Sequence, residues 1–217
     1  MTDYQTRRKT MVDTQIRPSD VTKFPIIEAF LSVPREKFVP DGKREAAYIG
    51  ENFKIGQSRV ILEPRTLAKL LDALDIRNDE LVLDIGPGLG YSSAVISPMA
   101  EVVIAVEDDS SMANEAEEIL TEVGADNVVI QIGKLEDGAP EHGPYDVIIL
   151  QGGVEKIPSS IVKQLKNGGR VGAIFVEEGL GTAKIGFKLN DKINWRYSFN
   201  AAAPVLPGFF KQKDFVL

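Results

Sequence analysis

The residue pattern with the most chemical content lies near the middle of the chain, where an apolar run ends in a carboxylate and a glycine-rich turn. The run is Leu81–Ile85, and Asp84 is its fourth residue. Three glycines follow at alternate positions, namely Gly86, Gly88 and Gly90. Glycine at such a turn lets the backbone approach a ligand closely and adopt a positive φ without strain. The pattern predicts a ligand-binding turn between a strand and a helix that begins near Tyr91.

The spacing of this turn separates two classes of cofactor. A dinucleotide site prefers G-x-G-x-x-G, which brings a pyrophosphate to the helix N-terminus. The pattern here is D-x-G-x-G-x-G, and the carboxylate of Asp84 opposes a pyrophosphate but suits the ammonium or sulfonium of S-adenosylmethionine. Glu107 ends the next apolar run and can accept both ribose hydroxyls of either cofactor. The pattern therefore favours S-adenosylmethionine over NAD, and a purely structural glycine turn is the remaining interpretation.

The composition restricts the chemistry further. The 217 residues include no cysteine and one histidine, which excludes disulfides, thiolate nucleophiles and Cys-ligated metals. With His142 alone, a His-rich metal site is also excluded, so we predict no metal. A solvent-exposed, non-catalytic His142 is expected, because it lies in the loop Glu141–Pro144.

Charge and hydropathy bear on partners and location. The net charge of −7 argues against nucleic acid as the main partner, which would require a basic face. The basic run Arg7–Lys9 is expected to be a solvated helix face. No apolar stretch reaches the roughly 20 residues needed to span a bilayer, and the start of the chain lacks the apolar region of a secretory signal. We therefore expect no membrane association and a cytoplasmic location.

The elements that would position the glycine turn follow from the rhythm of apolar residues. From residue 80, short apolar runs alternate with helical patterns, which is typical of an α/β fold with a doubly wound, mostly parallel sheet. The expected strands are Leu81–Ile85, Val102–Val106, Val128–Ile132, Val147–Leu150 and Val171–Val176. The expected helices between them are Tyr91–Pro98, Ser110–Val123 and Ser159–Leu165.

The two ends of the chain are expected to complete a single domain, 1–217. An N-terminal cap, 1–75, would contain helices at Thr2–Met11, Phe24–Leu31 and Pro64–Leu74, with irregular structure over Lys37–Pro64. The cofactor-binding core would span 76–180. The C-terminal part, 181–217, has strand-like pieces at Ile185–Leu189, Trp195–Phe199 and Lys213–Leu217.

Several motifs from about Arg8 to Phe175 resemble the protein-L-isoaspartate (D-aspartate) O-methyltransferase family. Val33–Pro40 matches the family's VPRE-x-FVP, and Leu83–Tyr91 resembles its L-E/D-IG-x-GSGY. The other matching segments are Ala47 and Tyr48 (AY), Ile55 and Gly56 with Pro64 eight residues later (IG and its downstream proline), Gly143–Asp146 (APFD), Ile157 and Pro158 (IP), and Gln164–Gly169 (QL-x-x-GG).

The resemblance implies a Rossmann-like, S-adenosylmethionine-dependent methyltransferase fold with an N-terminal helical cap. It implies methylation of the carboxylate of L-isoaspartyl residues in damaged proteins, which starts their repair through a succinimide. Such a carboxylate has a pKa near ~4 and needs no general base at neutral pH. The partner would be a protein or peptide carrying isoaspartate, and the chain a monomer or homodimer. The predicted cofactor site comprises Ile61, Leu62, Asp84, Gly86, Gly88, Gly90, Tyr91, Glu107, Asp108, Lys134 and Leu135.

The chain departs from the family pattern on the acceptor side. The family's active-site serine falls on Leu62, its Gln-Thr pair on Arg59 and Val60, and the aspartate of its GDG on Lys134. Leucine cannot donate a hydrogen bond to a substrate carboxylate. Gln151 lies after a predicted strand, where ligands bind in open parallel sheets. The acceptor-side candidates are therefore Arg59, Leu62 and Gln151.

Three interpretations of these departures stay open. The chain could still methylate isoaspartyl carboxylates, with backbone amides or the guanidinium fork of Arg59 replacing the serine. It could methylate a different acceptor, since fold and cofactor turn do not determine the substrate. It could also bind S-adenosylmethionine or a partner without catalysis. The segment Leu150–Gly153 lacks the (N/D)PP(Y/F/W) tetrad of enzymes that methylate exocyclic amino groups of bases.

Overall fold

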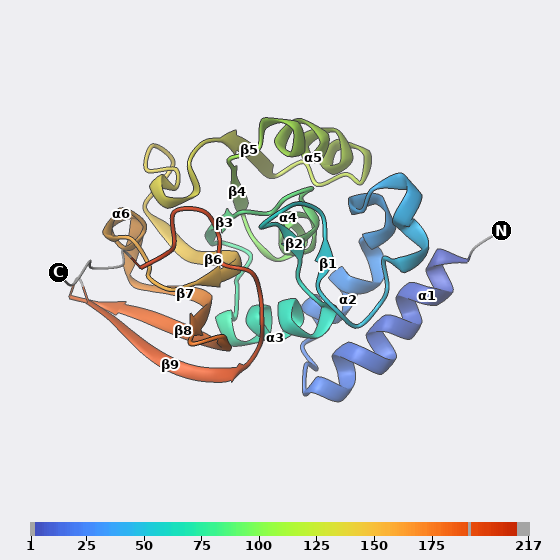
Figure 1. The fold of residues 1–217 in the computed structure, drawn as a ribbon, viewed down its shortest axis with the longest axis horizontal. Helices are drawn as coiled ribbons and strands as arrows, with labels where there is room; N and C mark the ends of the chain where they lie inside the picture. Colours follow the sequence, from blue (N-terminus) through green and yellow to red (C-terminus); the bar gives the residue numbers. More distant parts are fainter. Residues whose placement is uncertain (1–2, 191, 212–217) are drawn as a thin grey trace.

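The computed structural model describes residues 3–190 and 192–211, and a seven-stranded sheet runs through its centre (Figure 1). The strand order is β5-β4-β3-β6-β7-β8-β9. The strands are β3 (Leu81–Ile85), β4 (Val102–Glu107), β5 (Val128–Ile132), β6 (Tyr145–Val154), β7 (Leu165–Glu177), β8 (Leu180–Leu189) and β9 (Lys192–Asn200). Strands β3 to β7 pair in parallel, and β8 and β9 are added antiparallel. The predicted doubly wound, mostly parallel sheet is confirmed.

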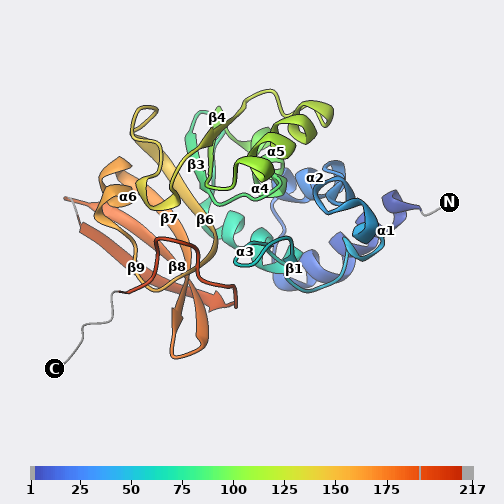
Figure 2. The same ribbon diagram turned by 45° about the horizontal axis from the view of Figure 1, so that its top comes forward.

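Helices cover the sheet and form the cap. The longer ones are α1 (Tyr4–Met11), α2 (Phe24–Ser32), α3 (Pro64–Leu74), α4 (Tyr91–Ile96), α5 (Ser110–Glu122) and α6 (Ser159–Gln164). Short helical turns lie at Val12–Ile16, Arg17–Ser19, Arg35–Phe38, Asp41–Ala46, Ser97–Met99 and Leu135–Asp137, and a two-stranded hairpin pairs β1 (Phe53–Lys54) with β2 (Val60–Ile61). In both views α1 and α2 lie at the opposite end of the molecule from β8 and β9 (Figures 1 and 2).

The inner parallel strands β3, β4 and β6 are buried on both faces, which explains their continuous Val, Ile and Leu runs. The edge strand β5 leaves Val129 and Ile132 exposed. Val82 belongs to the apolar cluster formed with the cap helices α1 to α3 and with α4. Leu83, the next residue, belongs to a second cluster that contains Leu206 and Phe209 of the C-terminal segment. Because successive side chains of a strand point to opposite faces, the C-terminal segment and the helical cap cover opposite faces of the sheet.

Local signals explain where the helices begin. Helix α5 starts after Asp109, whose carboxylate accepts the amide hydrogens of Ser111 and Met112 at 2.9 and 3.1 Å, as an N-cap residue does. Helix α3 starts at Pro64, and proline is well suited to a first helical position. These starts agree with the sequence predictions.

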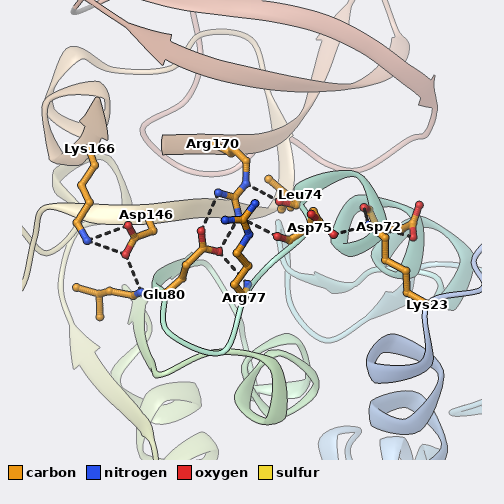
Figure 3. A network of polar contacts seen from close by, with 10 residues as sticks. Lys23, Asp72, Leu74, Asp75, Arg77, Glu80, Asp146, Lys166 and Arg170 are labelled. Atoms are coloured by element: carbon orange, nitrogen blue, oxygen red, sulfur yellow. Dashed lines mark hydrogen bonds and ion pairs between the residues drawn. The ribbon is translucent and has the colours of Figure 1, made fainter. Parts of the chain in front are cut away.

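A polar network joins elements at the amino ends of the strands (Figure 3). Arg170 of β7 donates to both carboxylate oxygens of Glu80, just before β3, at 2.9 and 2.6 Å. The same guanidinium donates to the carbonyl of Leu74 at 2.5 Å, which ties the end of α3 to the sheet. Beside it, Lys166 pairs with Asp146 at 2.7 Å. This network lies at the end of the strands opposite to the glycine turn.

The structure extends four predicted strands, β6 to β9, beyond their predicted limits, because pairing with a neighbouring strand continues outside the apolar runs. The change at β6 bears on the site. Gln151 lies inside β6, which continues to Val154 instead of ending at Leu150. Pairing of β6 with β7 is irregular between Ile149 and Gly153 and resumes at Gly153 and Val154. Gly153 also donates its amide to the carbonyl of Pro204 in the C-terminal segment at 2.8 Å. That long-range contact has no local sequence signal.

Other expectations concern single residues and the chain ends. His142 is exposed in a turn, as predicted, and Trp195 packs edge to face on Phe175. The strand expected at Lys213–Leu217 lies outside the described residues. Within residues 3–190 and 192–211, no helix has the length and apolarity needed to cross a membrane.

Candidate cofactor and acceptor site

The glycine turn after β3 has the backbone conformation that its sequence predicts. Gly86, Gly88 and Gly90 have φ values of +73°, +60° and +92°, which side-chain-bearing residues rarely adopt. A Cβ atom at Gly88 would lie 2.3 Å from Cδ1 of Ile55. A Cβ at Gly86 would lie 3.3 Å from the side chain of Leu206. Glycine is therefore required here both by conformation and by close approach.

The carboxylate of Asp84 is fully buried and joins three elements. Its Oδ2 accepts from the hydroxyls of Ser92 and Ser93 in α4, both at 2.6 Å. Its Oδ1 accepts from Nε2 of Gln151 in β6 at 2.7 Å. Burial raises the pKa of Asp84, and these hydrogen bonds oppose the rise. The carboxylate thus connects β3, α4 and β6, and its contact with a cofactor stays a prediction.

Replacing Asp84 with asparagine should change how stability depends on pH. Because burial raises the pKa of Asp84 above its ordinary value of 3.8, the folded protein holds this proton more tightly than the unfolded chain. The stability that the group contributes is full below its unfolded pKa and is lost as the pH rises through the folded pKa. The free energy of unfolding of the variant minus that of the wild type should therefore increase with pH over this interval. Urea unfolding across the acidic range measures it, and a pH-independent difference would contradict the prediction.

Glu107, at the end of β4, is the second buried carboxylate of the site. Its Oε2 accepts the amide hydrogen of Gly88 at 2.9 Å. Its Oε1 accepts the amides of Asp108 and Asp109 at 3.0 and 3.2 Å, and Nε and Nη2 of Arg59 at 3.1 Å each. Burial raises the pKa of Glu107, and the guanidinium opposes this rise. Arg59, a candidate for the acceptor side, thus forms an ion pair with the carboxylate that is predicted to bind the ribose.

Arg35 is a buried charged residue beside Tyr91 that sequence reasoning did not single out. It is fully buried, and Nε donates to the carbonyl of Ala47 at 2.7 Å while Nη2 donates to that of Leu62 at 3.0 Å. Its guanidinium lies 4.6 Å from the ring centre of Tyr91. No carboxylate in the described part of the chain forms an ion pair with it, and burial lowers its pKa. No clear signal in the sequence marks Arg35, because Glu36 and Lys37 follow it directly and the three charged residues look alike.

The remaining predicted residues lie at different depths around the turn. Ile61 and Leu62 are buried in and after β2, and Leu62 is 1% exposed. Leu135 is buried, with its Cδ1 3.5 Å from the position of a Cβ at Gly86, whereas Lys134 is exposed. Leu206 also packs against Gly86, a contact that the sequence did not predict. The structure therefore brings Leu135 to the glycine turn, and contact of Leu62 or Lys134 with a cofactor stays a prediction.

Comparison with known proteins agrees with the motifs and the geometry. The family model for protein-L-isoaspartate (D-aspartate) O-methyltransferase matches residues 6–195. A protein-L-isoaspartate O-methyltransferase of Syntrophus aciditrophicus is 39% identical over 79% of this chain and 78% of its own length. One of Opitutus terrae is 35% identical over 76% of this chain and 70% of its own length.

Solved structures give the same fold. A protein-L-isoaspartate O-methyltransferase structure covers 93% of this chain and 66% of its own, with a TM-score of 0.81 and 26% identity. A structure of a Plasmodium falciparum protein in complex with S-adenosyl-L-homocysteine covers 95% of this chain and 99% of its own, with a TM-score of 0.78 and 19% identity. The match over residues 6–195 and the similarity to curated relatives show that the chain belongs to the protein-L-isoaspartate (D-aspartate) O-methyltransferase family.

Proposed function

We propose that this chain is an S-adenosylmethionine-dependent O-methyltransferase that methylates the carboxylate of L-isoaspartyl residues in damaged proteins. The observation that carries the proposal is the hydrogen bond from Gly88 to Glu107, which joins the glycine turn to the end of β4 in a member of this family. The site lies at the carboxyl end of β3, whose two neighbours in the sheet are β4 and β6. The chain passes from β3 to β4 on one side of β3 and later returns to form β6 on its other side. Ligands of open α/β sheets bind at such switch points.

The residues present fit the chemistry of a nucleoside cofactor. The glycines of the turn carry no Cβ atom, so a ligand can approach their backbone closely. Glu107 is an acceptor at the end of the neighbouring strand, suited to ribose hydroxyls. Leu135, which lies beside Gly86, and Ile61 are buried apolar side chains. We propose that these groups hold the cofactor together with Asp84 and the other predicted residues.

The proposed reaction requires little acid–base chemistry from the protein. S-adenosylmethionine supplies a methyl group on a positively charged sulfur. The acceptor carboxylate is already ionised at neutral pH, so the residues of the chain need only position the groups in line and exclude water. The exposed His142 has no part in this scheme.

The residues on the acceptor side favour a second candidate function, namely that of a protein that binds the cofactor but does not methylate isoaspartyl residues. Leu62 stands where the family serine is expected, and its side chain is buried. Arg59, the alternative donor for the substrate carboxylate, is paired with Glu107 and Asp108. A different methyl acceptor is compatible with the same observations. The proposal includes a protein substrate, a cytoplasmic location and a monomer or homodimer, and the net charge of −7 supports the exclusion of nucleic acid.

A methyl-transfer assay on an isoaspartyl peptide and its aspartyl counterpart tests the proposal, with Leu62→Ser as a paired variant. We expect turnover on the isoaspartyl peptide only, and faster turnover for Leu62→Ser, because the new hydroxyl can donate to the acceptor carboxylate. The variant should lose about 2–4 kcal/mol of stability, since a buried apolar side chain is truncated. Cofactor binding without turnover by either protein would favour the second candidate.

A further inference from the structure

Side chains from two distant segments cover the glycine turn and the neighbouring carboxylate. Ile55 and Arg59 come from the β1–β2 hairpin, 53–61, and Leu206 comes from the C-terminal segment. Ile55 packs over Gly88, and Leu206 packs over Gly86. The surface on which a cofactor's ribose and methionine parts are proposed to bind is therefore in contact with the protein's own side chains.

Arg59 makes the most specific of these contacts. Its Nε and Nη2 both donate to Oε1 of Glu107 at 3.1 Å, and Nη2 also pairs with Asp108. Glu107 is 0% exposed and Arg59 is 5% exposed, so the pair is shielded from solvent. A carboxylate offers about four lone-pair positions, and the amides of Gly88, Asp108 and Asp109 use others. Four of these donors share Oε1, whereas Oε2 accepts only the amide of Gly88 among the described residues. A bidentate contact of two ribose hydroxyls, one on each oxygen, therefore requires Arg59 to leave Oε1.

The guanidinium is not fully satisfied in this position. Nη1 of Arg59 is buried and has no hydrogen-bond partner in the described part of the chain. A buried donor without an acceptor raises the free energy of the arrangement that contains it. The hairpin itself is held by strands of only two residues each, which are too short to be stable alone. Arg59 is thus a contact that can open, and the hairpin depends on it.

We propose that Arg59 is an internal competitor for the cofactor's ribose: it occupies Glu107 until the ligand displaces it, and so sets the affinity of this chain for its cofactor. This inference rests on the proposed function, because it concerns the same site. Apparent affinity falls in proportion to the fraction of molecules in which the site is accessible. Removal of the guanidinium should raise that fraction. It also leaves a buried carboxylate without its counter-ion, which ligand hydroxyls can then satisfy.

Calorimetric titration with S-adenosylhomocysteine compares the wild type with Arg59→Gln. We expect Arg59→Gln to bind about tenfold more tightly, since a larger fraction of the variant has an accessible site. Arg170→Gln is the matched control, because it removes a partly buried ion pair with Glu80 at the opposite end of the strands (Figure 3). It should lower stability without changing the affinity. Equal or weaker binding by Arg59→Gln would overturn the proposal.

Hydrogen exchange of the ligand-free proteins gives a second measurement. The amides of Ile55 and Gly56, which donate to the carbonyl of Arg59, and the amide of Gly88 should exchange faster in Arg59→Gln than in the wild type or in Arg170→Gln. Unchanged exchange would overturn the proposed role of Arg59. If neither protein binds S-adenosylhomocysteine, the proposed cofactor is wrong, and exchange by itself decides whether Arg59 holds the hairpin on Glu107.

A milder variant covers the case in which Arg59→Gln does not fold. Ile55→Ala keeps the ion pair but removes the side chain that packs over Gly88. Its affinity for S-adenosylhomocysteine should rise by a smaller factor than that expected for Arg59→Gln. A decrease would mean that the hairpin contributes contacts to the ligand instead of competing with it, which contradicts the proposal.

Discussion

Replacing Arg35 with alanine should lower the free energy of unfolding by about 4 kcal/mol, as measured by urea unfolding. Two charge-assisted hydrogen bonds, to the carbonyls of Ala47 and Leu62, are lost at roughly 1.5–3 kcal/mol each. A cavity forms at a fully buried position. Relief from burying a cation offsets part of this loss. The net effect is large because one side chain holds two segments of the cap against the start of α4.

Two further substitutions distinguish the loss of hydrogen bonds from the cavity left by Arg35→Ala. Arg35→Met keeps most of the volume and removes the charge and the donors, so it should lose less stability than Arg35→Ala. Arg65→Ala is the exposed control, with 43% of its side chain accessible, and should change stability by less than about 0.5 kcal/mol. If Arg35→Met were as stable as the wild type, the cost of burying the cation would equal the value of its hydrogen bonds, and the proposed structural role would be wrong.

Replacing Gly88 with alanine should lower the free energy of unfolding by about 3 kcal/mol. The φ of +60° accounts for roughly 1–2 kcal/mol in a residue with a Cβ. The clash with Ile55, whose Cδ1 would lie 2.3 Å away, adds about 1–3 kcal/mol, as overpacking does. Thermal or urea unfolding measures the sum.

Gly124 provides the matched control for this prediction. It also has a positive φ, +75°, but no atom of the described residues, its two chain neighbours aside, lies within 4 Å of its Cβ position. Gly124→Ala should therefore show only the conformational cost. The double variant Gly88→Ala/Ile55→Ala should lose less stability than the two single variants together, because without the Ile55 side chain the new Cβ atom meets no clash. If Gly88→Ala cost no more than Gly124→Ala, the close packing of the hairpin on the turn would be contradicted.

Much of the fold followed from local patterns. The sequence predicts β3, β4 and β5 almost to the residue. For β3 and β4 the reason is that strands buried on both faces need continuous Val, Ile and Leu. The turn at Gly86–Gly90 was recognisable because positive φ restricts the residue type. The limits of β6 are less predictable, since its extension to Val154 follows from pairing with Ile174 and Phe175 of β7 after a register shift.

The sequence by itself therefore determined the fold class, the glycine turn and the absence of cysteine and multi-histidine chemistry. Only the tertiary structure decided which partners the charged groups take. Arg59 and Glu107 are 48 positions apart, and the partner of Arg35 at Leu62 is a backbone carbonyl, which has no sequence signature. Such contacts depend on how separate segments pack across the ends of the strands. Local spacing specifies conformation, whereas pairing between distant segments is set by the packing of the whole domain.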